Sequence, residues 1–443
     1  MGNPRNKQLT IYIPAIIIVA VLALVPFHGF LTVWGSAIIG HYTLIRLWKE
    51  VLLAVCFIAA IYIFLKDKKI RDLFFKTRLT QLIIGFLIIE LIWGLVAHST
   101  GGVNTKALFY GWLSDTRYLI FFLVTLVISK KTSLIEKRSL KIIMYPAVIV
   151  VLFGLLQILV LPKDFLIHFG YGPNTIYPYE TINHNSNYIR IFSTLRGANP
   201  LGAYLLLPLS LATILLIKGK KVWYNGLFIL AGVAVMIFTF SRSAWLGLIV
   251  ALALSIYFGI KDKETKNRLL YLAVILGMLL CLTAIAGRHN TRIQNVLFHT
   301  QTHSKVKQTS DGQHGLALKK GIKDIATHPL GRGPGTSGPA SVYNSKLQRS
   351  PENYYLQMGQ ETGWLGLAVF LAINVYIVLS LWARKEDTLS LALLTSFAGL
   401  VICNLLLPAW SDDTLAYLWW GLAAVVIATK PKIGKFKDSR TII

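Results

Sequence analysis

Long runs of apolar residues, separated by short polar segments, recur along the whole chain of 443 residues. A helix needs roughly 20 mostly apolar residues to cross a hydrocarbon layer about 30 Å thick. The pattern therefore predicts an all-α integral membrane protein that forms a single polytopic membrane domain over 1–443. Its twelve predicted transmembrane helices cover 10–27, 47–65, 80–97, 108–128, 142–161, 198–217, 222–240, 243–260, 269–286, 363–382, 388–406 and 414–429.

The first apolar run, over 10–27, follows Arg5 and Lys7, as the apolar part of a signal peptide would. The run is long, however, and it lacks a clear pattern of small residues for cleavage. We therefore expect a first helix that is retained in the protein.

Basic residues are divided unevenly between the two sides of these helices. If every helix crosses, 27 of the 45 Lys and Arg residues lie on the side that holds both termini. The other side has 18, of which 10 belong to the single long loop 287–355, and long loops have little influence on orientation. The positive-inside rule therefore predicts that both termini face the cytoplasm.

The composition excludes several classes of protein. The chain is 55% hydrophobic and 14% charged, whereas a soluble domain is about a quarter charged. The net charge of +26 does not indicate a nucleic-acid partner, because the basic residues form short clusters between apolar runs. Cys56, Cys281 and Cys403 all lie within apolar runs, so we expect neither a disulfide framework nor a metal site.

Two segments on the predicted outer side are too long to be simple turns, 162–197 and 287–362. The second is a large loop between the ninth and tenth helices. Within it, 314–326 (HGLALKKGIKDIA) predicts a short amphipathic helix that lies on a surface. The Gly- and Pro-rich stretch 329–339 that follows predicts a loop, and it lacks the context of a nucleotide-binding P-loop. Long ordered loops often carry function.

Three arginines stand at helix ends on the predicted outer side. Arg190 and Arg196 come just before the sixth helix, and Arg242 lies between the seventh and the eighth. An arginine at a membrane edge can simply extend to the interface. A guanidinium group is also the preferred bidentate ligand of phosphate. Because all three lie in Ser- and Asn-rich helix junctions, a pyrophosphate site is the functional alternative.

Carboxylates supply a second candidate group. Glu352 and Glu361 lie in 351–366 (PENYYLQMGQETGWLG), and Pro351 predicts that Glu352 begins a helix. A carboxylate there is stabilised by the helix dipole, or it acts as a general base. Spacing alone leaves both interpretations open.

Weaker candidates lie elsewhere in the chain. Glu90 lies inside the third helix and either has a function or pairs with Arg117 or a backbone group. The pair Asp412–Asp413 is either a metal or supporting site or a solvated turn.

Four segments in order resemble the O-antigen ligase and polymerase family of polytopic membrane glycosyltransferases. They are 190–202 (RIFSTLRGANPLG), 238–248 (FTFSRSAWLGL), 328–335 (HPLGRGPG) and 352–366 (ENYYLQMGQETGWLG). The resemblance implies a donor glycan linked to polyprenyl diphosphate, generally undecaprenyl diphosphate. The glycan would move to a hydroxyl of a glycan or lipid-glycan acceptor at the outer face of the bacterial inner membrane. No metal or other cofactor is implied.

The resemblance also assigns residues to roles. Arg242 and Arg196, or Arg190 in place of Arg196, would bind the diphosphate, and Glu352 would be the catalytic base. Similar ligases carry His in the slot of Glu352, and Glu is intrinsically the weaker base, with a reference pKa of about 4.3 against about 6.5. The departure favours a polymerase. Further residues expected to bind the diphosphate or the glycan are Arg190, Asn199, Ser241, Asn353, Tyr354, Tyr355 and Glu361.

Other functions stay open from the sequence. Within the enzyme class they are an O-antigen ligase that transfers glycan to lipid A-core and a protein O-oligosaccharyltransferase. Outside it, a secondary transporter or flippase would also have about twelve helices, but it predicts polar residues at the bilayer midplane. Glu90 is nearly the only such residue. A scaffold protein would not need three arginines on the outer side.

Overall fold

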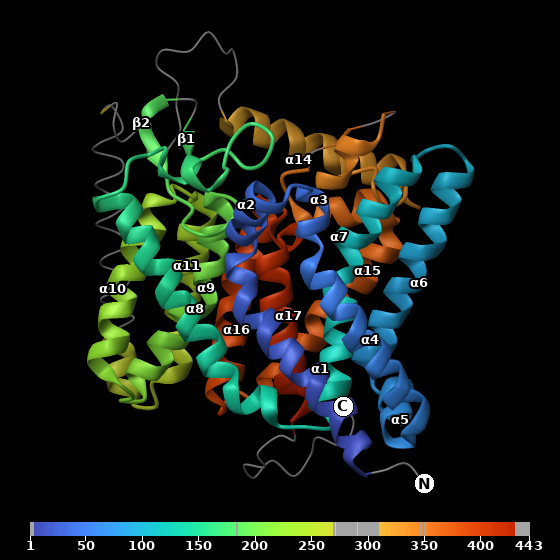
Figure 1. Cartoon of the computed structure of the whole chain (residues 1–443), viewed down its shortest axis with the longest axis horizontal. Coiled ribbons are helices and arrows are strands. Elements are labelled where there is room, and N and C mark those ends of the chain that lie inside the picture. The colour runs from blue at the N-terminus through green and yellow to red at the C-terminus, as the bar shows by residue number, and fades with distance from the viewer. Residues whose placement is uncertain are drawn as a thin grey trace.

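The structure is a computed structural model that describes residues 4–182, 185–268, 271, 290, 310–345, 348–349 and 351–429. Within these residues, nine helices are long and apolar enough to cross a membrane. Two shorter apolar helices, Val222–Phe238 and Asp413–Ala428, lie among them. The predicted all-α membrane fold is confirmed (Figure 1).

The first part of the chain is a series of helices with short connections. Its elements are α1 (Pro4–Leu24), η1 (Val25–Phe27), α2 (His28–Ile39), α3 (Tyr42–Arg46), α4 (Trp48–Lys66), α5 (Lys68–Lys76), α6 (Arg78–Ser99), α7 (Thr105–Ser129) and α8 (Leu134–Leu159).

The second part adds a small hairpin and several further helices. Its described elements are η2 (Phe165–Phe169), β1 (Glu180–Ile182), β2 (Asn185–Arg190), α9 (Ala198–Ile217), α10 (Val222–Phe238), α11 (Arg242–Gly259), α14 (Ser310–Thr327), η4 (Pro339–Tyr343), α15 (Tyr354–Trp382), α16 (Thr388–Leu406), η5 (Ala409–Ser411) and α17 (Asp413–Ala428).

Helices occupy eleven of the twelve predicted spans, and the span 269–286 lies outside the described residues. The predicted bounds 198–217 and 388–406 coincide with α9 and α16. Three predicted boundaries were wrong by many residues. The first helical run continues through α2 to Ile39, α8 begins at Leu134 rather than 142, and α15 begins at Tyr354 rather than 363.

The helices alternate in direction, which sorts their connections onto two faces of the molecule. One face holds α2, α3, the hairpin β1–β2 and α14, at the top of Figure 1. The opposite face holds α5 and the start of α1. The first face therefore carries the long segments that the sequence places outside, and we call it the outer face.

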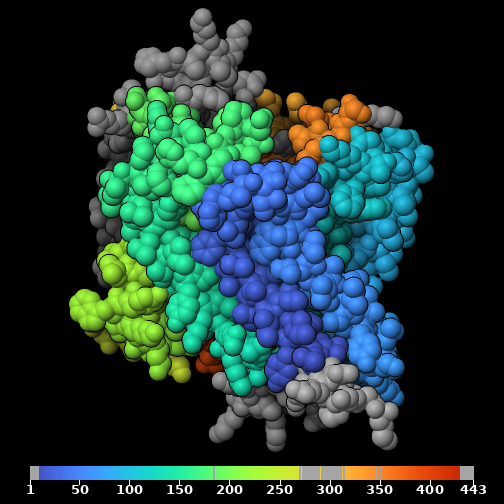
Figure 2. Space-filling model, viewed as in Figure 1, coloured from blue at the N-terminus to red at the C-terminus, as the bar shows by residue number. Residues whose placement is uncertain are grey.

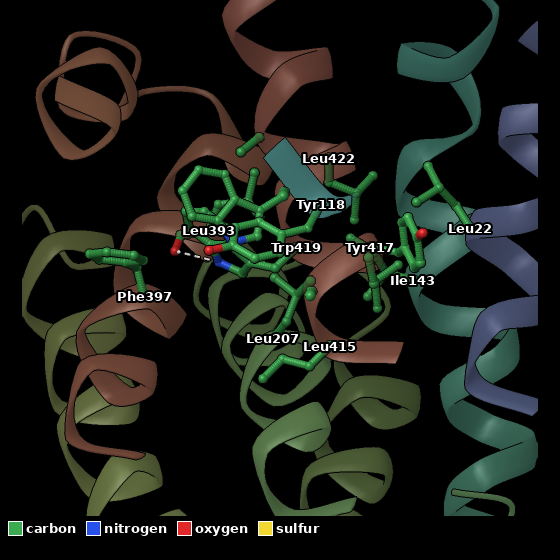
Figure 3. Close-up of a cluster of buried hydrophobic side chains, with 14 of the residues drawn as sticks. Leu22, Tyr118, Ile143, Leu207, Leu393, Phe397, Leu415, Tyr417, Trp419 and Leu422 are labelled. Atoms are coloured by element: carbon green, nitrogen blue, oxygen red, sulfur yellow. Dashed lines mark hydrogen bonds between the residues drawn. The ribbon is translucent and has the colours of Figure 1, made fainter. Parts of the chain in front are cut away.

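The core lies where α9, α16 and α17 meet α7. Trp419 and Trp420 of α17 are fully buried, and the Trp419 ring centroid lies 5.0 Å from that of Phe397. The Trp419 indole nitrogen donates to the Leu393 carbonyl at 3.4 Å. Trp419 belongs to a cluster of buried side chains that also includes Tyr118 of α7 and Leu207 of α9 (Figure 3). This packing fixes the end of α16, from which the candidate site is built. Segments of the N-terminal region, α1 to α4, cover the middle of one side (Figure 2).

Two surface elements complete the outer face. Strands β1 and β2 pair antiparallel, with Glu180 opposite Arg190, in a segment expected to be a loop. The predicted amphipathic helix at 314–326 is present as the longer α14. Ile325 of α14 is buried, and a Cβ atom at Gly359 of α15 would come within 2.6 Å of its side chain. The absence of a side chain at Gly359 therefore lets α14 lie close against α15.

Candidate functional site

The last turn of α16 gathers the starts of two other helices. The Cys403 thiol donates to the Ser243 carbonyl at 3.5 Å, and the Asn353 amide donates to the Leu405 carbonyl at 2.9 Å. Ser243 follows Arg242 at the start of α11, and Asn353 follows Glu352 before α15. The two principal candidates, Arg242 and Glu352, thus come from chain segments fixed to the same helix end.

Arg190 is held in a polar network beside this helix end. Its Nε donates to the Thr239 carbonyl at 2.9 Å, and its Nη2 donates to Oδ1 of Asn199 at 2.7 Å. Its Nη1 lies 3.4 Å from Oε2 of Glu180. Burial lowers the pKa of the Arg190 guanidinium, the Glu180 carboxylate raises it, and the positive charge of Arg242 lowers it. The charges of Arg190 and Arg242 therefore act on each other, and Asn199 orients Arg190.

Arg196 lies just before α9 and contacts the loop between α16 and α17. Its Nε donates to Oδ2 of Asp412 at 2.7 Å, and 39% of its side chain is exposed. It lines a cavity of about 180 Å³ together with Arg46 and Arg117. The remaining lining residues are Tyr110, Leu113, Ser114, Pro339, Ala340, Tyr343 and Ser411. Three guanidinium groups thus meet in a space that is small for a sugar chain and suits a compact anion.

Sequence reasoning missed Arg46 and Arg117. Each is a single basic residue near or within an apolar run, and such residues resemble ordinary charges at the membrane edge. Only the fold shows that Nη2 of Arg117 donates to the Ser411 carbonyl at 2.9 Å, which fixes the loop that carries Asp412.

The predicted interpretation of Asp412–Asp413 as a solvated turn is wrong. Both side chains are buried. Asp413 forms an ion pair with Arg117, and its Oδ2 lies 2.9 Å from Nζ of Lys49 and 3.4 Å from Nε2 of His28. These cations come from distant parts of the sequence, so the local pattern gave no sign of them.

Asp412 has a different role from its neighbour. Its Oδ1 accepts the backbone N–H groups of Thr414 and Leu415, which caps α17. Among the described residues, no three His, Cys, Asp or Glu side chains are grouped so that they could hold a metal ion.

The expectations for Glu90 and Glu352 also need correction. Glu90 does not pair with Arg117, because Arg117 pairs with Asp413 instead. Both carboxyl oxygens of Glu90 are buried and have no hydrogen-bond partner in the described part of the chain. Glu352 does not begin a helix, since α15 starts at Tyr354 and Asn353 caps it through Leu356 N at 2.9 Å.

The remaining candidates are buried to different degrees. Tyr354 is fully buried, and its hydroxyl lies 2.9 Å from that of Tyr118. Tyr355 is partly buried and packs beside Phe370, with ring centroids 6.2 Å apart. Of the two tyrosines, Tyr355 therefore offers the more accessible ring.

Ser241 and Glu361 make contacts within the protein. The hydroxyl of Ser241 lies 3.3 Å from that of Ser243. Oε1 of Glu361 accepts the backbone N–H groups of Gly335 at 2.9 Å and Ser337 at 3.0 Å. Glu361 thereby fixes the Gly- and Pro-rich loop over the start of α15.

Comparison with known families identifies the part of the chain that carries the α11 and α15 starts. Residues 226–371 match the model of the O-antigen ligase family. The match covers 146 of the 443 residues, so this part of the chain is similar to that family. The matched region includes Arg242, Ser241 and Glu352, whereas Arg190, Arg196 and Asn199 lie before it. The comparison with curated proteins found no match.

The match to the O-antigen ligase family over 226–371 gives the coarse function. It indicates a glycosyltransferase-like role in O-antigen assembly, with glycan or lipid-linked substrates, for a multi-pass bacterial membrane protein.

Proposed function

We propose that the chain is a metal-independent glycosyltransferase that lengthens a surface polysaccharide at the outer face of the inner membrane. Its donor is a glycan linked to undecaprenyl diphosphate, and its acceptor is a sugar hydroxyl on a second glycan. The observation that carries the proposal is the attachment of the Arg242 and Glu352 segments to one helix end. The charge of Arg242 acts on Arg190, and Arg196 pairs with Asp412 on the loop that follows the same helix.

The arginines would bind and stabilise the leaving diphosphate. The bond between the anomeric carbon and the diphosphate oxygen breaks, and its electron pair leaves with the diphosphate. Negative charge therefore grows beside Arg242 and Arg196, and groups fixed in advance lower the barrier. Near a protein surface, one such contact at 4 Å is worth up to about 4 kcal/mol before desolvation.

Glu352 would act on the acceptor. Its carboxylate takes the proton of the attacking hydroxyl while the acceptor oxygen forms the new bond to the anomeric carbon. Attack from the side opposite the diphosphate gives inversion. A base must lie within hydrogen-bond reach of the proton it removes. The position of Glu352 just outside α15, on the outer face, suits this role better than a position inside the helix would.

The preference for a polymerase rests on the same residue. Similar ligases carry His where this chain has Glu352, and that departure favours chain extension over transfer to lipid A-core. An O-antigen ligase or a protein O-oligosaccharyltransferase would use the same arginines with a different acceptor. A transporter or flippase would give no covalent product.

The test is incubation of the purified full-length chain with an undecaprenyl-diphosphate-linked oligosaccharide. We expect longer lipid-linked glycans on gel or mass analysis. Transfer only to added lipid A-core would identify a ligase, and transfer only to a protein would identify an O-oligosaccharyltransferase. The absence of any new glycosidic bond would contradict the proposal that the chain is a glycosyltransferase.

Variants connect that activity to the proposed residues. Arg242→Ala and Glu352→Gln should each reduce the transfer rate roughly 100-fold or more, because each removes a group that acts in the transition state. Arg268→Ala and Glu264→Gln are matched controls, since both side chains are 74% exposed and distant from the proposed site. Full transfer by folded Arg242→Ala and Glu352→Gln would refute the assigned roles.

A further inference from the structure

A second and larger cavity lies on the outer face between α14 and the start of α15. Its volume is about 550 Å³, within the range of sites for small ligands. Its charged lining comes from α14 and from the segment after it: Lys320, Lys323, Asp324, His328, Arg332 and Arg349. Nothing in the proposed diphosphate site uses these residues.

The charge of this cavity is strongly positive. Two lysines and two arginines face a single carboxylate, that of Asp324. Oδ1 of Asp324 accepts from Nε of Arg332 at 3.1 Å and from its Nη2 at 2.9 Å. Oδ2 lies 3.2 Å from Nε of Arg349. Asp324 thus orients both guanidinium groups but balances only one positive charge, so the cavity attracts an anion.

One donor in the cavity wall is unused. Nη1 of Arg349 is buried and has no hydrogen-bond partner in the described part of the chain. An unpaired buried donor is costly, and an anion that comes within hydrogen-bond distance would satisfy it. Burial lowers the pKa of the Arg349 guanidinium, and the Asp324 carboxylate opposes this shift. The guanidinium group of arginine is effectively always protonated in proteins, so Arg349 carries a positive charge.

The position of the cavity relates it to Glu352. Pro351 lines the cavity, and Glu352 is the next residue of the chain. The N–H of Arg332 donates to the Gln360 carbonyl at 2.9 Å, which ties the basic segment to the first turns of α15. The cavity therefore lies next to the segment that carries the proposed base.

We propose that this cavity binds the acceptor glycan through an acidic sugar residue, one that carries a carboxylate or phosphate group. The acceptor role rests on the proposed function, whereas recognition of the acidic sugar does not. The guanidinium N–H groups of Arg332 and Arg349 that do not contact Asp324 bind the anion, and Lys320 and Lys323 add charge at the cavity mouth.

The test uses the full-length chain in nanodiscs of neutral phosphatidylcholine, with tetragalacturonate as the probe. Its methyl ester is the matched control, because the sugar chain is the same and the carboxylates are neutral. We expect the acid to bind at least roughly tenfold more tightly than the ester. Equal affinity for the two would overturn the proposal.

Substitutions of the lining residues test whether the acidic sugar binds in the cavity. Arg332→Gln and Arg349→Gln should remove most of the preference for the acid, and the exposed Lys320→Gln should weaken it without affecting folding. Lys319→Gln is the matched control, because Lys319 is an exposed neighbour that does not line the cavity. A preference that survives in Lys320→Gln and in both arginine variants would contradict the assignment.

The headgroup of an anionic lipid is the competing ligand for the positively charged cavity. Binding in phosphatidylglycerol nanodiscs should fall only modestly, by general screening. If phosphatidylglycerol abolishes sugar binding in the wild type, the cavity is a lipid headgroup site and the proposal fails. These binding measurements contain no lipid-linked glycan donor. A negative result in them is therefore distinguishable from a failure of chain extension. Preference for the acid without any transfer would leave the site intact and refute only the enzyme.

Discussion

Single residues on the outer face are mostly held in ion pairs that join distant parts of the sequence. Arg196 pairs with Asp412, and Arg117 and Lys49 pair with Asp413. The sequence singled out Arg242 and Glu352 because they stand in recognisable segments at helix ends. It named Arg117 only as a possible partner of Glu90 and did not name Lys49, because a lone cation gives no sign of its partner hundreds of residues away.

The most sensitive residue of this network is Asp413. Asp413→Ala leaves Arg117 and Lys49 buried without their shared carboxylate, and breaking a buried pair in this way costs about 3–5 kcal/mol. We expect a clear fall in the midpoint of thermal unfolding of the purified chain. Asp72→Ala is the control, since its pair with Lys76 is exposed and worth about 0–1 kcal/mol. Similar shifts for the two variants would show that the network does not stabilise the fold.

Among the elements, α15 differs most from the prediction. The predicted membrane span began at 363, at the end of the outer segment 287–362, although Pro351 predicted a helix from Glu352. In the structure, residues 354–362 are already helical. The helix is interrupted at Gly363, whose φ is 67° and ψ is −167°. The loop before it satisfies the displaced backbone, since Trp364 N donates to the Pro329 carbonyl at 2.9 Å and Gly333 N to the Glu361 carbonyl at 2.8 Å. Hydropathy alone does not reveal such a tertiary arrangement.

Gly363 therefore has a testable role. Its backbone conformation is almost restricted to glycine, and other residues there cost about 1–3 kcal/mol. A Cβ atom would also collide with backbone atoms of 329–331. Gly363→Ala should lower the midpoint of thermal unfolding, whereas Gly85→Ala, which meets no atom within 4 Å, should leave it equal or slightly higher. An unchanged midpoint for Gly363→Ala would contradict this account of the kink.

The other elements were predicted more accurately where they form long apolar runs. The long spans α9 and α16 were located to the residue, because both ends are marked by polar or turn residues. The hairpin β1–β2, the helix α3 and the amphipathic α5 were missed. They are short, they lie at the two faces, and they depend on tertiary packing rather than on a long apolar run.

For the whole molecule, the two faces of the structure match the two sides predicted from the distribution of basic residues. The loop 218–221 lies on the face predicted to be cytoplasmic, and Tyr177, which is 64% exposed, lies on the segment predicted to be external. In a chain without its native cysteines, we expect Lys220→Cys to react with an impermeant maleimide only from the inside. Tyr177→Cys should react only from the outside. The reverse pattern would invert the orientation and place the arginines on the wrong side.

The central claim is that guanidinium groups at the outer end of α16 hold a lipid diphosphate. The most direct measurement is the affinity of the purified chain for undecaprenyl diphosphate, with undecaprenol as the uncharged reference. We predict much tighter binding of the diphosphate. Arg196→Gln and Arg242→Gln should each weaken that binding roughly tenfold or more, and Arg268→Gln should not. Equal affinity for the two lipids, or no loss in either arginine variant, would contradict the account.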